Sequence, residues 1–200
     1  MQISSEPGEA FFLAAIGPSI HKFDLVTKKL ICEIKTFSSN AMTLFDKDQT
    51  LLVANDCEVR LWDLTSFKPT VIASIHAPFP VTGAYADKSS SSRSVCITGG
   101  KDLIIYKNDL EKVFQAQVDA HITAVAFTEE DVLIGTASGK ICRLNGKTGK
   151  SMQTFSVVRN KPVTSLTRFT GIKEVNVFLA TIDNNRLFLV KEKGGKTEEI

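Results

Sequence analysis

The chain has 200 residues, of which 43% are hydrophobic and 23% charged, the balance of a globular domain rather than of a disordered chain. Its 24 basic and 22 acidic residues give a formal net charge of +2, which argues against partners that need a strong field, such as nucleic acid or an anionic membrane surface. No apolar stretch approaches the roughly 18 residues of a membrane helix, and the first ten residues lack the basic region of a secretory signal.

Five segments along the chain repeat one pattern: an apolar strand, a tight turn, and a strand in which polar and apolar residues alternate. They cover residues 11–25, 50–64, 94–108, 131–145 and 176–191. A residue near the end of each second strand serves as a marker, and successive markers lie 39, 44, 38 and 46 residues apart. The markers are Phe23, Trp62, Tyr106, Leu144 and Val190. A period of about 40–45 residues indicates the four-stranded blade of a propeller.

The spacers between these segments predict the other two strands of each blade, because they are short and rich in β-branched and aromatic residues. Strands are expected over residues 41–46, 81–87, 122–128 and 163–169, and over 30–35, 70–75, 112–118 and 151–156. No window combines helical periodicity with helix caps. The sequence therefore predicts an all-β fold in one repeat domain, residues 1–200.

At these residues the chain resembles the WD40-repeat family. Its second repeat contains RLWDL, which ends in the Trp-Asp pair that closes such repeats. The resemblance implies a structural network in which a turn aspartate, a histidine before the first strand and the tryptophan share hydrogen bonds. The residues that match it are Asp56, Trp62, Asp63, His76, Asp102, His121 and Asp183. No repeat holds a complete set, so apolar packing is expected to stabilise the blades.

The two ends of the chain predict incomplete blades. The first recognisable strand resembles the second strand of a blade, and the polar residues after Lys191 predict no fourth strand. We therefore expect about three full and two partial blades, in an incomplete or small propeller. Its open edges would be completed across the two ends of the chain, by a partner or by self-association.

Several motifs that suggest chemistry have a simpler interpretation. NGKTGKS, from Asn145, resembles a phosphate-binding loop, but Leu144 stands where the first glycine belongs, so a hairpin turn is expected. His76 and His121 lie one repeat apart, which favours structural roles, and His21 is expected to face water. The acidic run from Glu129 to Asp131 predicts a solvated turn.

The four cysteines predict free thiols rather than disulfides or a zinc site, because they are widely separated in the chain. They are Cys32, Cys57, Cys96 and Cys142, and they are expected to be small buried hydrophobic residues. This usage favours an intracellular protein, cytoplasmic or nuclear. No cofactor and no metal are predicted.

The pattern favours a non-catalytic scaffold that binds proteins in a multi-protein complex; which partner it binds is not predicted. Arg60, Phe79 and Arg143 are the candidate partner contacts, and the serine run at residues 89–92 is a candidate phosphorylated loop. One alternative is a subunit of an RNA-processing or ribosome-biogenesis assembly, and another is a fragment of a longer WD40 protein. An enzyme with its site in a central channel is a third alternative, disfavoured because the expected innermost strands are apolar or small.

Overall fold

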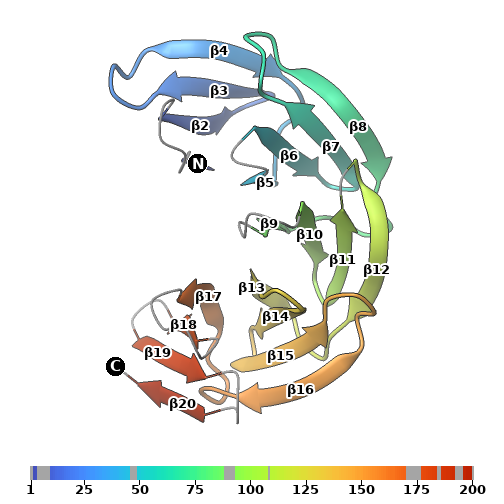
Figure 1. Ribbon diagram of the computed structural model, residues 1–200, viewed down its shortest axis with the longest axis vertical. Coiled ribbons are helices and arrows are strands. Elements are labelled where there is room, and N and C mark those ends of the chain that lie inside the picture. The colour runs from blue at the N-terminus through green and yellow to red at the C-terminus, as the bar shows by residue number, and fades with distance from the viewer. Residues whose placement is uncertain are drawn as a thin grey trace. The chain divides into compact units, whose positions relative to one another are not determined.

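A computed structural model gives the chain five antiparallel four-stranded sheets, and the strand order of each can be followed in Figure 1. The structure describes residues 2–3, 10–45, 49–87, 93–107, 109–169, 177–183, 186–191 and 196–199. Within these residues there is no helix, and so none that could cross a membrane. The all-β prediction is confirmed.

In every sheet the strands follow chain order, so each sheet is a meander. Sheet 1 holds β1 (Gln2–Ile3), β2 (Phe11–Ile16), β3 (Ser19–Asp24) and β4 (Leu30–Lys35). Sheet 2 holds β5 (Ala41–Phe45), β6 (Thr50–Asn55), β7 (Glu58–Asp63) and β8 (Thr70–His76). Sheet 3 holds β9 (Gly83–Ala86), β10 (Ser94–Gly99), β11 (Asp102–Lys107) and β12 (Glu111–Gln117). Sheet 4 holds β13 (Ile122–Phe127), β14 (Asp131–Thr136), β15 (Lys140–Asn145) and β16 (Ser151–Ser156). Sheet 5 holds β17 (Val163–Phe169), β18 (Val177–Ile182), β19 (Arg186–Lys191) and β20 (Lys196–Glu199).

The strands at the two ends of the chain differ from the sequence expectation. β1 pairs with β2, and β20 pairs with β19, so the outer sheets each gain a fourth strand that the hydrophobic pattern did not predict. Both strands are at a sheet edge, where backbone pairing on one side is enough. An edge strand needs no alternation of apolar residues, which is why Lys196–Glu199 was not predicted to be a strand.

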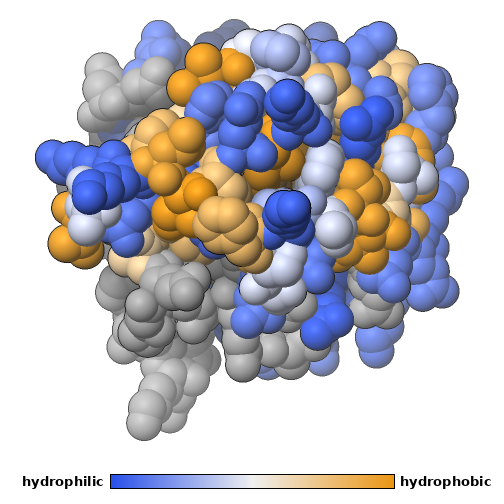
Figure 2. All heavy atoms as spheres, turned by 90° about the horizontal axis from the view of Figure 1, so that it is seen from above, coloured by the Kyte–Doolittle hydropathy of each residue, from blue (hydrophilic) through white to orange (hydrophobic). Residues whose placement is uncertain are grey.

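Burial follows position within the sheet. β6 and β14 are buried almost throughout, whereas the last strands, β8 and β16, alternate between half-buried and exposed residues. A strand covered on both faces reads as a continuous hydrophobic run, as in the sequence TLLVAN of β6. Figure 2 shows hydrophobic side chains interleaved with hydrophilic ones on the surface seen from above.

Packing divides the chain into two compact units. The first holds residues 1–97 and 106–112, and the second holds residues 98–105 and 113–200. In the first unit, sheets 1 and 2 share a core that includes Leu13, Ile20, Leu51 and Trp62. In the second unit, sheets 4 and 5 share a core that includes Leu133, Ile141, Phe178 and Phe188. Each core is made where one sheet face packs on another.

The turn between the second and third strands of every sheet contains one residue in the left-handed backbone region. These residues are Gly17, Asp56, Gly100, Gly139 and Asp183, with φ between 49° and 81°. Glycine adopts this conformation at little cost, and aspartate tolerates it better than most residues. At Gly139 a side chain is also excluded by space, because a Cβ there would lie 1.7 Å from the carbonyl oxygen of Val158.

Candidate functional site

Two members of the predicted repeat network, Asp56 and Asp183, lie in exposed turns and have mainly backbone roles. The carbonyl oxygen of Asp56 accepts a hydrogen bond from the amide of Val81 at 2.6 Å, and the amide of Asp183 donates to the carbonyl of Pro162 at 3.0 Å. The Asp183 carboxylate pairs with the Lys161 ammonium at 2.7 Å. Neither carboxylate makes a hydrogen bond to a histidine or tryptophan in the described part of the chain.

Trp62 and Asp63, the pair that suggested the family, point to different environments. Trp62 is buried in the core of sheets 1 and 2, and its indole nitrogen Nε1 has no hydrogen-bond partner among the described residues. The Asp63 carboxylate accepts the amide hydrogen of Thr65 at 2.8 Å and so caps the turn that follows β7. Hydrogen bonds from the Thr65 side chain and then its amide lower the pKa of Asp63.

The remaining network residues are not brought together with these. His76 is exposed at the end of β8, opposite Glu58. His121 is exposed; its carbonyl accepts from the amide of Ala137 at 2.8 Å, and its ring lies beside Gly100. Asp102 begins β11 and accepts a hydrogen bond from Gln117. The structure therefore uses these positions for turns and backbone contacts rather than for one shared side-chain network.

The three residues predicted to contact a partner differ in exposure and in the contacts they make. Phe79 is only 9% exposed, so its side chain is packed inside and the prediction that it contacts a partner is wrong. Arg60 is one-third exposed; it forms an ion pair with Glu58 and its guanidinium lies 4.8 Å from the centre of the Phe37 ring. Arg143 is less exposed and is held by an internal carboxylate.

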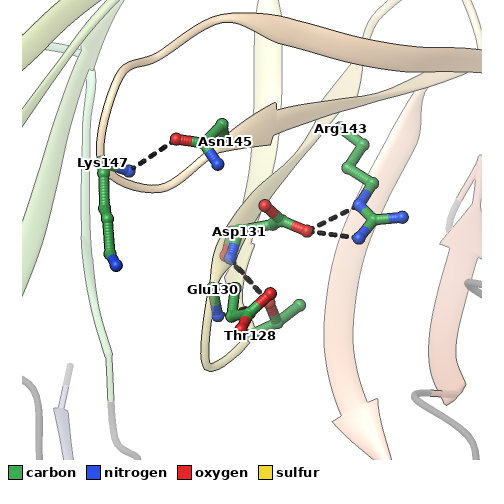
Figure 3. Close-up of polar contacts among 6 residues, drawn as sticks. All are labelled: Thr128, Glu130, Asp131, Arg143, Asn145 and Lys147. Atoms are coloured by element: carbon green, nitrogen blue, oxygen red, sulfur yellow. Dashed lines mark hydrogen bonds and ion pairs between the residues drawn. The ribbon is translucent and has the colours of Figure 1, made fainter.

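That carboxylate belongs to Asp131, which corrects another expectation. Asp131 was predicted to lie in a solvated turn, yet its side chain is 3% exposed and its Oδ2 accepts from Arg143 Nε at 2.7 Å. Figure 3 shows Nε and one terminal nitrogen of the Arg143 guanidinium directed at this oxygen, and the Asp131 amide donating to Thr128 Oγ1. Arg143 supplies the positive charge that makes burial of the carboxylate tolerable. Glu129 and Glu130 are exposed, as predicted.

The NGKTGKS segment forms the predicted hairpin turn. Asn145 Oδ1 accepts from the amides of Lys147 and Thr148 and from the Thr148 hydroxyl, at 3.2, 3.0 and 2.9 Å. Asp24 makes the same three contacts with Val26 and Thr27 in the turn between β3 and β4. The same pattern of side-chain contacts therefore holds the turn between the third and fourth strands in sheets 1 and 4.

All four cysteines are free, as predicted, but only two are fully buried. Burial raises the pKa of the Cys96 and Cys142 thiols, and it also raises the pKa of half-buried Cys32. A raised pKa keeps the thiol protonated and a poor nucleophile. No cluster of three metal-ligating side chains occurs among the residues that the structure describes. The serine run at residues 89–92 lies outside those residues.

A hollow in the first unit lies where β5 and β9 begin, and the sequence did not predict it. It has a volume of about 320 Å³, and we call it the β5–β9 cleft. The nine residues that line it are Ala15, Ser39, Asn40, Ala41, Met42, Thr82, Gly83, Ala84 and Tyr85. No lining residue is charged, and most are small, which leaves the backbone close to the open space.

Strand position adds to the character of this cleft. β5 is at one edge of sheet 2, and β9 is at one edge of sheet 3. An edge strand carries a row of backbone N–H and C=O groups with no strand partner in its own sheet. The side-chain carboxamide of Asn40 and the hydroxyl of Ser39 add neutral polar groups at the rim. The cleft can therefore offer backbone and neutral side-chain hydrogen bonds but, apart from the Tyr85 hydroxyl, no titratable group.

Comparison with known proteins leaves the family open and fixes the fold. No family model matches the chain, and no curated protein matches its sequence. Among solved structures, the chain is similar to BamB from Moraxella catarrhalis, a β-propeller, with a TM-score of 0.73 and 13% sequence identity. The chain has a β-propeller fold. The match covers 98% of this chain and 62% of that one, so this chain spans less than two-thirds of the matched structure.

Proposed function

We propose that this propeller chain is a non-catalytic scaffold of the WD40 type, and that its β5–β9 cleft binds an extended segment of a protein partner. The observation that carries this proposal is the lining of the cleft: small, uncharged residues on two edge strands. Extended peptides are recognised at such edges through main-chain hydrogen bonds, with side-chain pockets giving specificity. A neutral lining suits a partner segment without charged side chains.

The same lining supports a role in binding rather than catalysis. Acid–base and nucleophilic chemistry needs a titratable or activated group held at the site, and Tyr85 is the one such side chain that lines the cleft. The free thiols support an intracellular location for this scaffold, in the cytoplasm or the nucleus.

The proposal is tested by filling the cleft. Ala15 is exposed at its wall, so Ala15→Trp should fold normally and occupy the space that a partner segment needs. Ala137, an exposed alanine in the turn between β14 and β15, gives the matched control Ala137→Trp. Quantitative mass spectrometry of proteins that co-purify with each variant is the measurement.

We expect wild type and Ala137→Trp to retain the same partner in equal amount. The amount of that partner that co-purifies with Ala15→Trp should be lower by about tenfold or more, which is the effect of disrupting one central contact. Equal retention of that partner by Ala15→Trp would place binding elsewhere and contradict the proposal.

A further inference from the structure

A second hollow in the first unit lies beside the end of sheet 2 where β6 begins and β7 ends. Its volume is about 190 Å³, and it shares no lining residue with the β5–β9 cleft. Sheet 2 supplies most of the lining, and Arg93, just before β10, and Asp109, between β11 and β12, complete it. We call it the Thr50 hollow, after the residue that begins β6.

Three of the lining side chains form one row across sheet 2. Phe45 on β5 is opposite Thr50 on β6, and Thr50 is opposite Asp63 on β7. Opposed residues on neighbouring antiparallel strands share one face of the sheet. Leu51, which follows Thr50, and Trp62, which precedes Asp63, point into the core with sheet 1. By alternation, the row of Phe45, Thr50 and Asp63 lies on the opposite face of sheet 2, toward the hollow that it lines.

Thr50 is the buried polar residue of this row. It is 8% exposed, and its hydroxyl has no hydrogen-bond partner among the residues that the structure describes. Buried hydroxyls nearly always have such a partner, because a missing hydrogen bond leaves the desolvation of the group uncompensated. Since Thr50 lines the hollow, a hydrogen-bond donor bound there would supply the partner.

The charged groups of the lining leave the hollow with a net negative charge. Asp63 and Asp109 contribute two carboxylates and Arg93 contributes one guanidinium, and the other six lining residues are uncharged. Hydrogen bonds from the Thr65 side chain and then its amide lower the pKa of Asp63, so this carboxylate is ionised at neutral pH. A bound group with a single positive charge would therefore balance the charge of the lining.

We propose that the Thr50 hollow binds the side chain of a lysine in a protein partner. The lysine ammonium has three donors and one positive charge, which match the Thr50 hydroxyl and the carboxylates of Asp63 and Asp109. Its aliphatic stem can pack on the buried side chains of Phe45 and Leu61. Small-molecule sites usually measure about 300–1,000 Å³, so a hollow of about 190 Å³ suits a single side chain better.

Two other cations fit this lining less well. An arginine guanidinium is a planar fork that is best matched by both oxygens of one carboxylate, whereas the carboxylates here come from Asp63 in sheet 2 and Asp109 in sheet 3. A calcium ion takes about 6–8 oxygen ligands, and no group of three metal-ligating side chains occurs in the described part of the chain. The lysine site goes beyond the proposed function, because binding at the β5–β9 cleft does not require it.

The site is tested by titrating the ¹⁵N-labelled full chain with a capped Ala-Lys-Ala tripeptide and following its amide signals by two-dimensional NMR. We expect saturable shifts of the Thr50, Asp63 and Thr65 amides. The same tripeptide with norleucine in place of lysine keeps the aliphatic stem without the charge, and it should bind at least about tenfold more weakly. Equal binding of the two peptides, tighter binding of an arginine tripeptide, or the absence of saturable shifts at these residues would overturn the proposal.

Variants then assign the binding to the hollow. Asp109→Asn removes a charge from an exposed turn, and Thr50→Val removes the hydroxyl while nearly keeping its shape; each should weaken binding of the lysine peptide by about three- to tenfold. Asp119→Asn makes the same change as Asp109→Asn in an exposed loop away from the hollow, and it should bind like wild type. Ala15→Trp, which fills the β5–β9 cleft, should also bind like wild type, so the two proposals can fail separately. Unchanged binding by Asp109→Asn, or equal weakening by Asp119→Asn, would contradict the site.

Discussion

Aspartate in the turns of this chain acts through backbone conformation. Asp56 and Asp183 hold the left-handed position that glycine holds in the other three sheets. The sequence could show that an aspartate stands at this turn, but it could not show whether the carboxylate or the φ angle matters. The unpartnered indole nitrogen of Trp62 supports the second interpretation, because the expected hydrogen-bond network does not reach it.

Substitution of Asp56 separates the two interpretations. Glycine accepts φ near 49° without strain, so Asp56→Gly should change the free energy of unfolding by no more than about 0.5 kcal/mol. Asp56→Val should cost about 1–2 kcal/mol, because a β-branched residue is strained there. Urea unfolding of the two variants measures this. A large decrease in the free energy of unfolding of Asp56→Gly would instead show that the Asp56 carboxylate stabilises the turn.

The turn carboxylate of Asp24 gives a prediction about pH. Hydrogen bonds from the Thr27 amide and then the Thr27 hydroxyl lower the pKa of Asp24 below 3.8. A folded-state pKa below the unfolded value contributes stability above the unfolded pKa, and that contribution is lost as pH falls through the folded pKa. Asn145 makes the same contacts without charge, so we expect Asp24→Asn to preserve the turn.

Wild type should therefore melt at a higher temperature than Asp24→Asn near neutral pH, because hydrogen bonds to a charged acceptor are stronger. The difference should shrink and vanish as pH is lowered through the acid range below about 4. Thermal melts of both proteins across that range are the measurement. A difference that stays constant with pH would show that the Asp24 charge does not stabilise the turn.

Among the elements, sheet 4 shows how two strands can be joined by a pair that hydropathy does not reveal. Asp131 opens β14 and Arg143 lies near the end of β15, on the neighbouring strand. The sequence alone predicts that Asp131 is exposed to water, because two glutamates precede it. Its burial depends on a partner 12 residues away, and the strand register that brings the two together is a property of the folded sheet.

A double-mutant cycle measures this link. Asp131→Ala and Arg143→Ala should each destabilise the chain, since each leaves the other charge without its partner in a largely dry site. The double variant should lose less than the sum of the two, with a coupling free energy of about 1–3 kcal/mol. Chemical denaturation of the four proteins gives the value. Additive losses would mean that the pair contributes nothing to β14–β15 cohesion.

For the whole molecule, the repeat period predicted the number and place of the sheets. The pairs of central strands at 11–25, 50–64, 94–108, 131–145 and 176–191 all formed where the alternation placed them. The β5–β9 cleft could not be predicted in this way. Its lining comes from Ala15, residues 39–42 and residues 82–85, which share no motif and meet only through packing. Phe79 lies in the loop between β8 and β9, as the sequence indicates, but its burial there could not be predicted from the sequence.

The claim that this cleft binds a protein segment is tested most directly by hydrogen exchange of the chain with and without the partner that wild type retains. Bound partner should slow exchange of backbone amides at residues 39–42 and 82–85, because a paired edge strand protects them. Ala15→Trp, given the same partner at the same concentration, should show no such protection. Protection confined to other segments, with these amides unchanged, would contradict the account.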